Sequence, residues 1–153
     1  MARELTRPTG PHPSMAEFPN PKAGLLLTYL VVSADVEASR HFYADVLGGE
    51  TVLDAGDFAI VALANGWVTI TAGGEPTPDK PTVTLRPPVD PNHASGFLNI
   101  RVADIESAYH EWRALGAPFL TPPIDRGSEI RCYMRDPDGH LIEVGQVIDA
   151  GPP

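Results

Sequence analysis

One short phrase of this sequence occurs twice. Asp35-Val36-Glu37-Ala38-Ser39 reappears in similar form as Asp104-Ile105-Glu106-Ser107-Ala108, and the copies begin 69 residues apart. At the same offset His41 coincides with His110. An internal repeat constrains a fold more than any single motif, because each copy must form the same unit. The flanking segments predict a strand, a helix and three further strands in each copy. Since neither unit can cover both faces of its own sheet, we expect the two units to associate.

The first unit is predicted to occupy residues 24–73. An apolar β segment at 25–32 leads to Asp35, a good N-cap for a helix over 36–47 that Gly48 ends. Strands are then expected at residues 50–53, 58–63 and 67–71, with turns at Ala55-Gly56-Asp57 and Asn65-Gly66 between them.

The second unit is predicted to occupy residues 95–148. A strand at 97–102 precedes Asp104, which caps a helix that Gly116 ends. A strand at 118–121 and the two strands of a hairpin should follow. A Pro-rich connection, 74–94, joins the units as a linker or covering loop, with one extended piece at 83–85.

The ends of the chain are predicted to lie outside this single domain of residues 24–148. Residues 1–23 contain five prolines among small and polar residues, which is typical of a flexible arm, and Met15 is an alternative start. Residues 149–153 are expected to form a loose tail.

The hairpin surrounds Asp136-Pro137-Asp138-Gly139, which is a tight-turn sequence. A two-residue loop would place Glu143 opposite Cys132 and mix apolar and polar faces. A three-residue loop with Gly139 in the left-handed conformation would place Glu143 opposite Tyr133 and keep the faces separate. The sequence therefore predicts the second register.

Composition excludes several classes of function. The chain has 11 Lys and Arg against 20 Asp and Glu, a formal net charge of −9, so it has no basic face for nucleic acid or an anionic membrane. No apolar run is long enough to span a bilayer. The single Cys132 excludes an intrachain disulfide and is expected to be a small core residue. No signal peptide is apparent, so a cytoplasmic location is expected.

Two motifs carry a resemblance to a known superfamily. The helix Asp35-Val36-Glu37-Ala38-Ser39-Arg40-His41-Phe42-Tyr43-Ala44-Asp45-Val46-Leu47-Gly48 and the hairpin Asp136-Pro137-Asp138-Gly139-His140-Leu141-Ile142-Glu143 resemble those of the vicinal oxygen chelate superfamily, which includes glyoxalase I, extradiol dioxygenases and bleomycin resistance proteins. The resemblance covers about residues 25–146. It implies an α+β fold of two βαβββ modules whose mixed sheets curve around a cleft, and members of this length are commonly homodimers.

The resemblance also implies four metal-ligand positions, one on the first and one on the last strand of each module. In this sequence the first falls on Thr28 or Tyr29, the second on a strand without a carboxylate, and the third on Phe97. Only Glu143 matches. One carboxylate cannot hold a divalent transition metal tightly, so no metal is expected. If a weak divalent site exists, Glu143 with His93 is its candidate.

Strand alternation separates a helix-facing side from a cleft-facing side. The residues expected to face the cleft and bind a ligand combine aromatic and polar side chains: Trp67, Thr69, Phe97, Asn99, Arg101, Arg131, Tyr133 and Glu143. Such a mixture is typical of small-ligand pockets. An unpaired arginine would favour an anionic ligand, and two cleft arginines argue against a cationic drug. A simple Arg–Glu pair that satisfies a buried charge is the structural alternative.

The sequence is compatible with three functions. The first is a protein that binds a small organic molecule without metal chemistry. The second is an enzyme, a lyase, isomerase or dioxygenase-like member, that acts on a small oxygenated anion. Glu143 would be its general base or a lone metal ligand, and Arg101 and Tyr133 would be its other catalytic residues. The third is a purely structural dimer module whose cleft is filled by its own side chains.

Overall fold

The computed structural model describes residues 24–148, so the predicted arm at 1–23, its alternative start and the tail at 149–153 lie outside the described residues. The first unit contains strand β1 (Tyr29–Val32), helix α1 (Val36–His41), the π-helical turn η3 (Phe42–Val46) and strands β2 (Glu50–Asp54), β3 (Phe58–Leu63) and β4 (Gly66–Thr71). The strand order is β1-β4-β3-β2, and β1 pairs with β4 in parallel.

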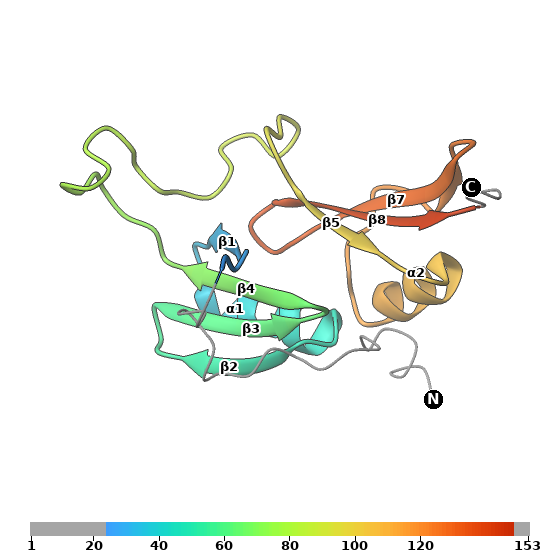
Figure 1. Cartoon of the computed structure of the whole chain (residues 1–153), viewed down its shortest axis with the longest axis horizontal. Helices are drawn as coiled ribbons and strands as arrows, with labels where there is room; N and C mark the ends of the chain where they lie inside the picture. Colours follow the sequence, from blue (N-terminus) through green and yellow to red (C-terminus); the bar gives the residue numbers. More distant parts are fainter. Residues whose placement is uncertain (1–23, 149–153) are drawn as a thin grey trace.

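The second unit repeats this topology. It contains β5 (Leu98–Arg101), α2 (Ile105–Ala114), β6 (Ile124–Asp125), β7 (Glu129–Arg135) and β8 (Leu141–Val147), in the order β5-β8-β7-β6. Figure 1 shows the two sheets as separate ladders, each with its own helix. The predicted α+β fold of two βαβββ units is confirmed. Among the described residues no helix is long and apolar enough to cross a membrane.

Both helices begin where the sequence predicts. A side-chain oxygen of Asp35 accepts a hydrogen bond from the Ala38 backbone N–H at 3.0 Å, and Asp104 does the same for Ser107 at 3.1 Å. These caps satisfy backbone donors that have no partner inside the helix. The first helix departs from prediction at its end, where η3 replaces regular α-helix from Phe42 onward.

Two strand predictions need correction. The strand expected at 118–121 is wrong: only Phe119 makes an isolated bridge there, to Met134, and the ladder forms instead at β6. Pro118, Pro122 and Pro123 lack the backbone N–H that continuous pairing requires. The first strand also begins at Tyr29 rather than at residue 25, because only Tyr29–Val32 have partners on β4.

The hairpin has the predicted register. Tyr133 pairs with Glu143 and Arg135 with Leu141, and Gly139 has φ of 92°. The left-handed glycine therefore places the Glu143 side chain on the same face as Tyr133.

One apolar core joins the two units. Val68 and Ile70 of the first sheet and Met134 and Ile142 of the second belong to the same buried cluster, so these residues form the core-facing sides of both sheets. Cys132 is also buried there, and burial raises the pKa of its thiol to about 11, so it is an inert core residue.

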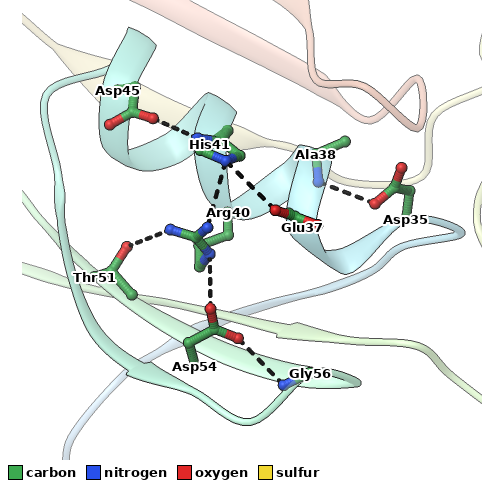
Figure 2. A network of polar contacts seen from close by, with 9 residues as sticks. All are labelled: Asp35, Glu37, Ala38, Arg40, His41, Asp45, Thr51, Asp54 and Gly56. Atoms are coloured by element: carbon green, nitrogen blue, oxygen red, sulfur yellow. Dashed lines mark hydrogen bonds and ion pairs between the residues drawn. The ribbon is translucent and has the colours of Figure 1, made fainter.

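The Arg40 side chain fastens α1 to the edge of its sheet. Figure 2 shows its guanidinium between the helix and β2, where Nη1 donates to Thr51 Oγ1 at 3.4 Å and Nε lies 3.3 Å from Asp54 Oδ2. The neighbouring His41 points away from the core and contacts Glu37 and Asp45. His41 therefore lies on the solvent-exposed face of the helix.

Polar contacts at the β7–β8 turn also hold the two units together, and we call this group the inter-unit junction. Asp136 accepts a hydrogen bond from Tyr43 Oη at 2.8 Å, and Asp138 accepts from the Ala34 backbone N–H at 2.7 Å and from Ser39 Oγ at 2.9 Å. His140 Nε2 donates to the Val32 carbonyl at 2.8 Å. The turn that precedes Glu143 is therefore docked on the first unit. The full junction consists of Val32, Ala34, Ser39, Tyr43, Asp136, Asp138 and His140.

The connection between the units follows a defined path outside both sheets (Figure 1). Its first part folds back on itself, because the backbones of Gly74 and Leu85 exchange hydrogen bonds at 2.8 and 3.0 Å. Its last part lies against the β7–β8 hairpin, where Arg135 Nη2 donates to Asn92 Oδ1 at 2.7 Å.

Candidate ligand-binding site

Glu143 is the only buried glutamate among the described residues, with 6% of its surface exposed. Strand β8 places it between two neighbours. Its Oε1 accepts a hydrogen bond from Asn99 Nδ2 of β5 at 2.8 Å, and its Oε2 accepts one from Tyr133 Oη of β7 at 2.7 Å. The strand pairing explains this arrangement, because Asn99 and Tyr133 are the register partners of Glu143 on either side. A buried carboxylate needs such donors to compensate for its lost hydration.

The two arginines predicted for this face are paired with glutamates. Arg101 Nη1 donates to Glu129 Oε2 at 2.8 Å and lies 3.8 Å from Glu143 Oε1, and Arg131 Nη1 donates to Glu129 Oε1 at 3.3 Å. The hydrogen bond from Arg101 lowers the pKa of Glu129 below its usual value. Two positive and two negative charges therefore balance on this face, and neither arginine is left unpaired.

An aromatic pair borders the carboxylate. The ring of Phe97 meets that of Tyr133 edge to face, with centroids 6.0 Å apart. Burial and the hydrogen bond to Glu143 raise the pKa of Tyr133, so its phenol stays protonated and donates at neutral pH. Phe97 is 42% exposed, which leaves part of an aromatic surface open to solvent beside a hydrogen-bonded carboxylate.

Gly145 provides the space in which Arg101 lies. A Cβ atom at Gly145 would be 2.3 Å from Arg101 Nη1 and 3.0 Å from its Cζ. The guanidinium therefore lies directly over the β8 backbone. We define the ligand face as the surface of β5, β7 and β8 formed by Phe97, Asn99, Arg101, Glu129, Arg131, Tyr133, Leu141 and Glu143.

The two candidates from the first sheet are located elsewhere. Trp67 is buried in a small apolar cluster with Ile60 and Ala62, and Leu26 packs against it. Thr69 is buried on the same sheet, and its hydroxyl has no hydrogen-bond partner among the described residues. The structure brings together the six candidates of the second unit, whereas Trp67 and Thr69 lie on β4 of the other sheet. A ligand-binding role for these two stays a prediction.

The ligand face does not fit the divalent metal that the superfamily uses. Glu143 is the only carboxylate or imidazole among the four implied ligand positions, and the guanidinium of Arg101, 3.8 Å from Glu143 Oε1, would repel a cation. Phe97 cannot be a ligand. The alternative partner, His93, is exposed and hydrogen-bonds Asp90 through Nδ1 at 2.6 Å. The donor set is therefore that of a hydrogen-bonded carboxylate rather than that of a transition-metal centre.

A second group of side chains has the composition of a metal site. Among residues 24–148, only Asp136, Asp138 and His140 form a cluster of three or more residues whose ligand atoms lie within 4.8 Å of one another. Each carboxylate oxygen already accepts a hydrogen bond, since the Asp138 and His140 backbone N–H groups also donate to Asp136 Oδ1 at 3.0 and 2.9 Å. The cluster is the inter-unit junction, and its donor atoms are occupied by protein groups.

Three residues at the site, Glu129, Leu141 and Gly145, are absent from the set of ligand-binding residues predicted from the sequence. Glu129 continues the odd-numbered row of β7 that contains Arg131 and Tyr133, so strict alternation along the strand could have identified it. The role of Gly145 gives no signal in the sequence, because it depends on the path of a side chain from another strand.

Comparisons with known proteins bear on the family and the fold. The family model described as "Glyoxalase/Bleomycin resistance protein/Dioxygenase superfamily" matches residues 25–144. No curated protein sequence matches the chain.

Solved structures with the same fold are distant in sequence. A glyoxalase/bleomycin resistance protein/dioxygenase from Nocardioides has a TM-score of 0.63 and 21% identity, and the match covers 90% of this chain and 93% of that one. TnmS3, an antibiotic binding protein from Streptomyces sp. CB03234, has a TM-score of 0.59 and 20% identity over 82% of this chain and 98% of that one. A lactoylglutathione lyase from Agrobacterium tumefaciens has a TM-score of 0.54 and 20% identity over 83% and 95%.

These neighbours establish the shared fold, and the family model covers the first repeated unit and the second as far as residue 144, which includes Glu143. The chain belongs to the glyoxalase/bleomycin resistance protein/dioxygenase superfamily.

Proposed function

We propose that this protein binds a small organic molecule on the ligand face, without a tightly bound catalytic metal. The observation that carries the proposal is the arrangement around Glu143, where a buried, hydrogen-bonded carboxylate lies beside the partly exposed Phe97–Tyr133 pair. Apolar surface with a few converging polar groups is what small-ligand sites offer. The similarity to TnmS3 is consistent with this class of function, since that protein is an antibiotic binding protein.

The proposal rests on the hydrogen-bonding capacity and the apolar surface that remain open to a ligand on this face. Glu143 keeps accepting capacity beyond its two bonds, because a carboxylate has about four lone-pair directions. A ligand hydroxyl or N–H could donate to Glu143, while an aromatic ring of the ligand could contact Phe97. The balanced charges of Arg101, Arg131, Glu129 and Glu143 mean that this part of the face has no strong preference for an anion.

A binding screen with a matched pair of variants tests the proposal. We expect aromatic compounds that carry a hydroxyl or N–H group to raise the melting temperature of the wild type. Glu143→Gln should weaken their binding about tenfold, which corresponds to the loss of a charge-assisted hydrogen bond. Glu106→Gln, an exposed change on α2, should leave binding unchanged.

Two results would contradict this assignment. The first is unchanged affinity in Glu143→Gln for every compound that binds the wild type. The second is a stoichiometric divalent ion, found by elemental analysis of protein purified without added metal, that disappears in Glu143→Gln.

An enzyme is the second candidate, favoured by the contact between Tyr133 Oη and Glu143 Oε2. In that case Glu143 would act as general base towards a bound substrate, and Asn99 or Arg101 would stabilise the developing negative charge. The same variant separates the two functions. Loss of turnover with retained binding in Glu143→Gln would establish the enzyme, and parallel loss of both would favour a binding protein.

We also propose that the protein acts as a homodimer. Apolar side chains remain exposed before and along β1, at Leu25, Leu27 and Leu30, and burying them against a second copy would contribute about 25 cal/mol per Å². Light scattering should give twice the chain mass of 16.4 kDa. Leu30→Glu should reduce the mass to that of one chain, while Leu115→Glu, at the end of α2, should not. A monomeric wild type would refute the dimer.

A further inference from the structure

A pocket lies next to the ligand face, at the place where the connection meets the β7–β8 turn. It has a volume of about 280 Å³, and its walls come from three parts of the connection and from the start of β8. Its lining includes Arg86, His93, Ser95, Gly96, His140 and Leu141. The packing that forms it is close, since a Cβ atom at Gly139 would lie 3.1 Å from Pro91 Cβ.

Donors without partners are concentrated around this pocket. The guanidinium of Arg86 makes no ion pair or hydrogen bond with any residue from 24 to 148, in contrast to Arg101 and Arg131 of the ligand face. The Ser95 hydroxyl and the backbone N–H groups of Ser95 and Gly96 likewise have no hydrogen-bond partner in this part of the chain. Arg86, Ser95 and Gly96 therefore bring one positive charge and two amide donors to a single pocket of a protein with a net charge of −9.

No acidic residue lines the pocket, and the acidic residues adjacent in sequence to its lining residues accept hydrogen bonds from other groups. Asp90 accepts a hydrogen bond from His93 Nδ1 at 2.6 Å and another from the Asn92 backbone N–H at 2.9 Å. Asp136 and Asp138 belong to the inter-unit junction, where all four of their oxygens accept hydrogen bonds. The imidazole of His93 is held by Asp90 with its Nε2 free of any partner among the described residues.

Leu141 joins the pocket to the ligand face. It lines the pocket and lies two residues before Glu143 on β8, so both side chains are on the same side of the strand. Gly96 lines the pocket directly before Phe97, whose ring is part of the ligand face. The pocket is therefore one end of the same surface.

We infer that this pocket is the anion subsite of the ligand face, and that the natural ligand is an aromatic molecule bearing a carboxylate or phosphate group. Arg86 and the amides of Ser95 and Gly96 bind the anionic oxygens, while the ring lies along Leu141, Phe97 and Tyr133. The inference deepens the proposed function by adding a ligand class. It also assigns anion recognition to a residue of the connection instead of to the arginines on the strands.

The test uses benzoate and benzamide, which have the same ring and differ in charge. Isotope-labelled full-length protein is titrated with each, and the backbone amide signals of Ser95, Gly96 and Glu143 are followed by NMR. We expect the wild type to bind benzoate about fivefold more tightly than benzamide, the effect of one exposed ion pair. Arg86→Gln should abolish this preference. Arg126→Gln, which removes another exposed arginine without a described side-chain partner, should keep the preference for benzoate.

A third titration, with phenyl phosphate, distinguishes a phosphate ligand from a carboxylate ligand.

The outcomes separate this inference from the proposed function. Equal affinity for benzoate and benzamide in the wild type, or a preference that survives in Arg86→Gln, would overturn the subsite even if both compounds perturb the Glu143 signal. If neither compound perturbs the Glu143 signal, the proposed function loses its support. The anion subsite can still be tested in that case by titration with inorganic phosphate. Phosphate that shifts Ser95 and Gly96 in the wild type but not in Arg86→Gln supports the subsite, and identical shifts in both proteins exclude it.

Discussion

Asp136→Ala should lower the free energy of unfolding by about 3 kcal/mol, because it removes the acceptor for Tyr43 Oη and for two backbone N–H groups at a buried position. Chemical denaturation at neutral pH measures the change. Asp138→Ala is the matched comparison in the same turn. It loses two bonds at a partly exposed position, and about 1 kcal/mol is expected. Equal effects of the two changes would contradict the central role of Asp136.

The same residue makes stability depend on pH in a defined direction. Burial raises the pKa of Asp136 above its ordinary value. A raised carboxyl pKa contributes stability that is fully present below the pKa of the unfolded chain, about 3.9, and is lost as pH rises through the folded value. The loss caused by Asp136→Ala should therefore be smaller at pH 7 than at pH 4. A larger loss at pH 7 would mean that the hydrogen bonds to the carboxylate outweigh its burial.

Gly73→Ala should destabilise the protein by about 3 kcal/mol and displace the connection. Gly73 has φ of 80°, a left-handed conformation that costs alanine about 1 kcal/mol. A Cβ atom there would also lie 2.4 Å from the Leu85 carbonyl oxygen and 2.6 Å from Val32 Cγ1. Backbone atoms cannot rotate away as a side chain can. The segment of the connection around Leu85 must therefore move, at a further cost of about 2 kcal/mol.

Gly66→Ala is the control for this prediction. It lies at the other end of β4, where no atom is within 4 Å of an added Cβ, and it has no positive φ. Thermal unfolding should distinguish the two variants clearly, and the amide signals of residues 85 and 86 should shift only in Gly73→Ala. Similar melting temperatures for both variants would refute the close contact at Leu85.

Much of the fold follows from local sequence signals. The repeated Asp at 35 and 104 predicts both helix starts, because an N-cap acts on its own first turn. The Tyr133–Glu143 pairing was predictable because only one loop length separates apolar from polar rows. Local rules failed where prolines interrupt a strand, so β6 lies at Ile124–Asp125 rather than at 118–121.

The sequence indicated which side chains share a face with Glu143, but not which charged side chains on that face form ion pairs. Alternation on three strands identified the face around Glu143, since side chains of one parity share a side. Whether Arg101 and Arg131 would be free depended on Glu129, which holds both. The inter-unit junction could not be predicted at all. Tyr43 and Asp136 are separated by 93 residues, and nothing local to either residue indicates the other.

The pairing register reveals a difference between the two copies of the repeat. Leu30 faces Thr69 across β1 and β4, and Asn99 faces Glu143 at the corresponding place across β5 and β8. The first copy closes this side of its sheet with the apolar cluster around Trp67, whereas the second copy keeps a charged, hydrogen-bonded network there. The two copies of the repeat therefore share one backbone plan and one core but differ in chemistry on this side of their sheets. Substitutions on this side of the second sheet can alter its surface charge without touching the side chains of the common core.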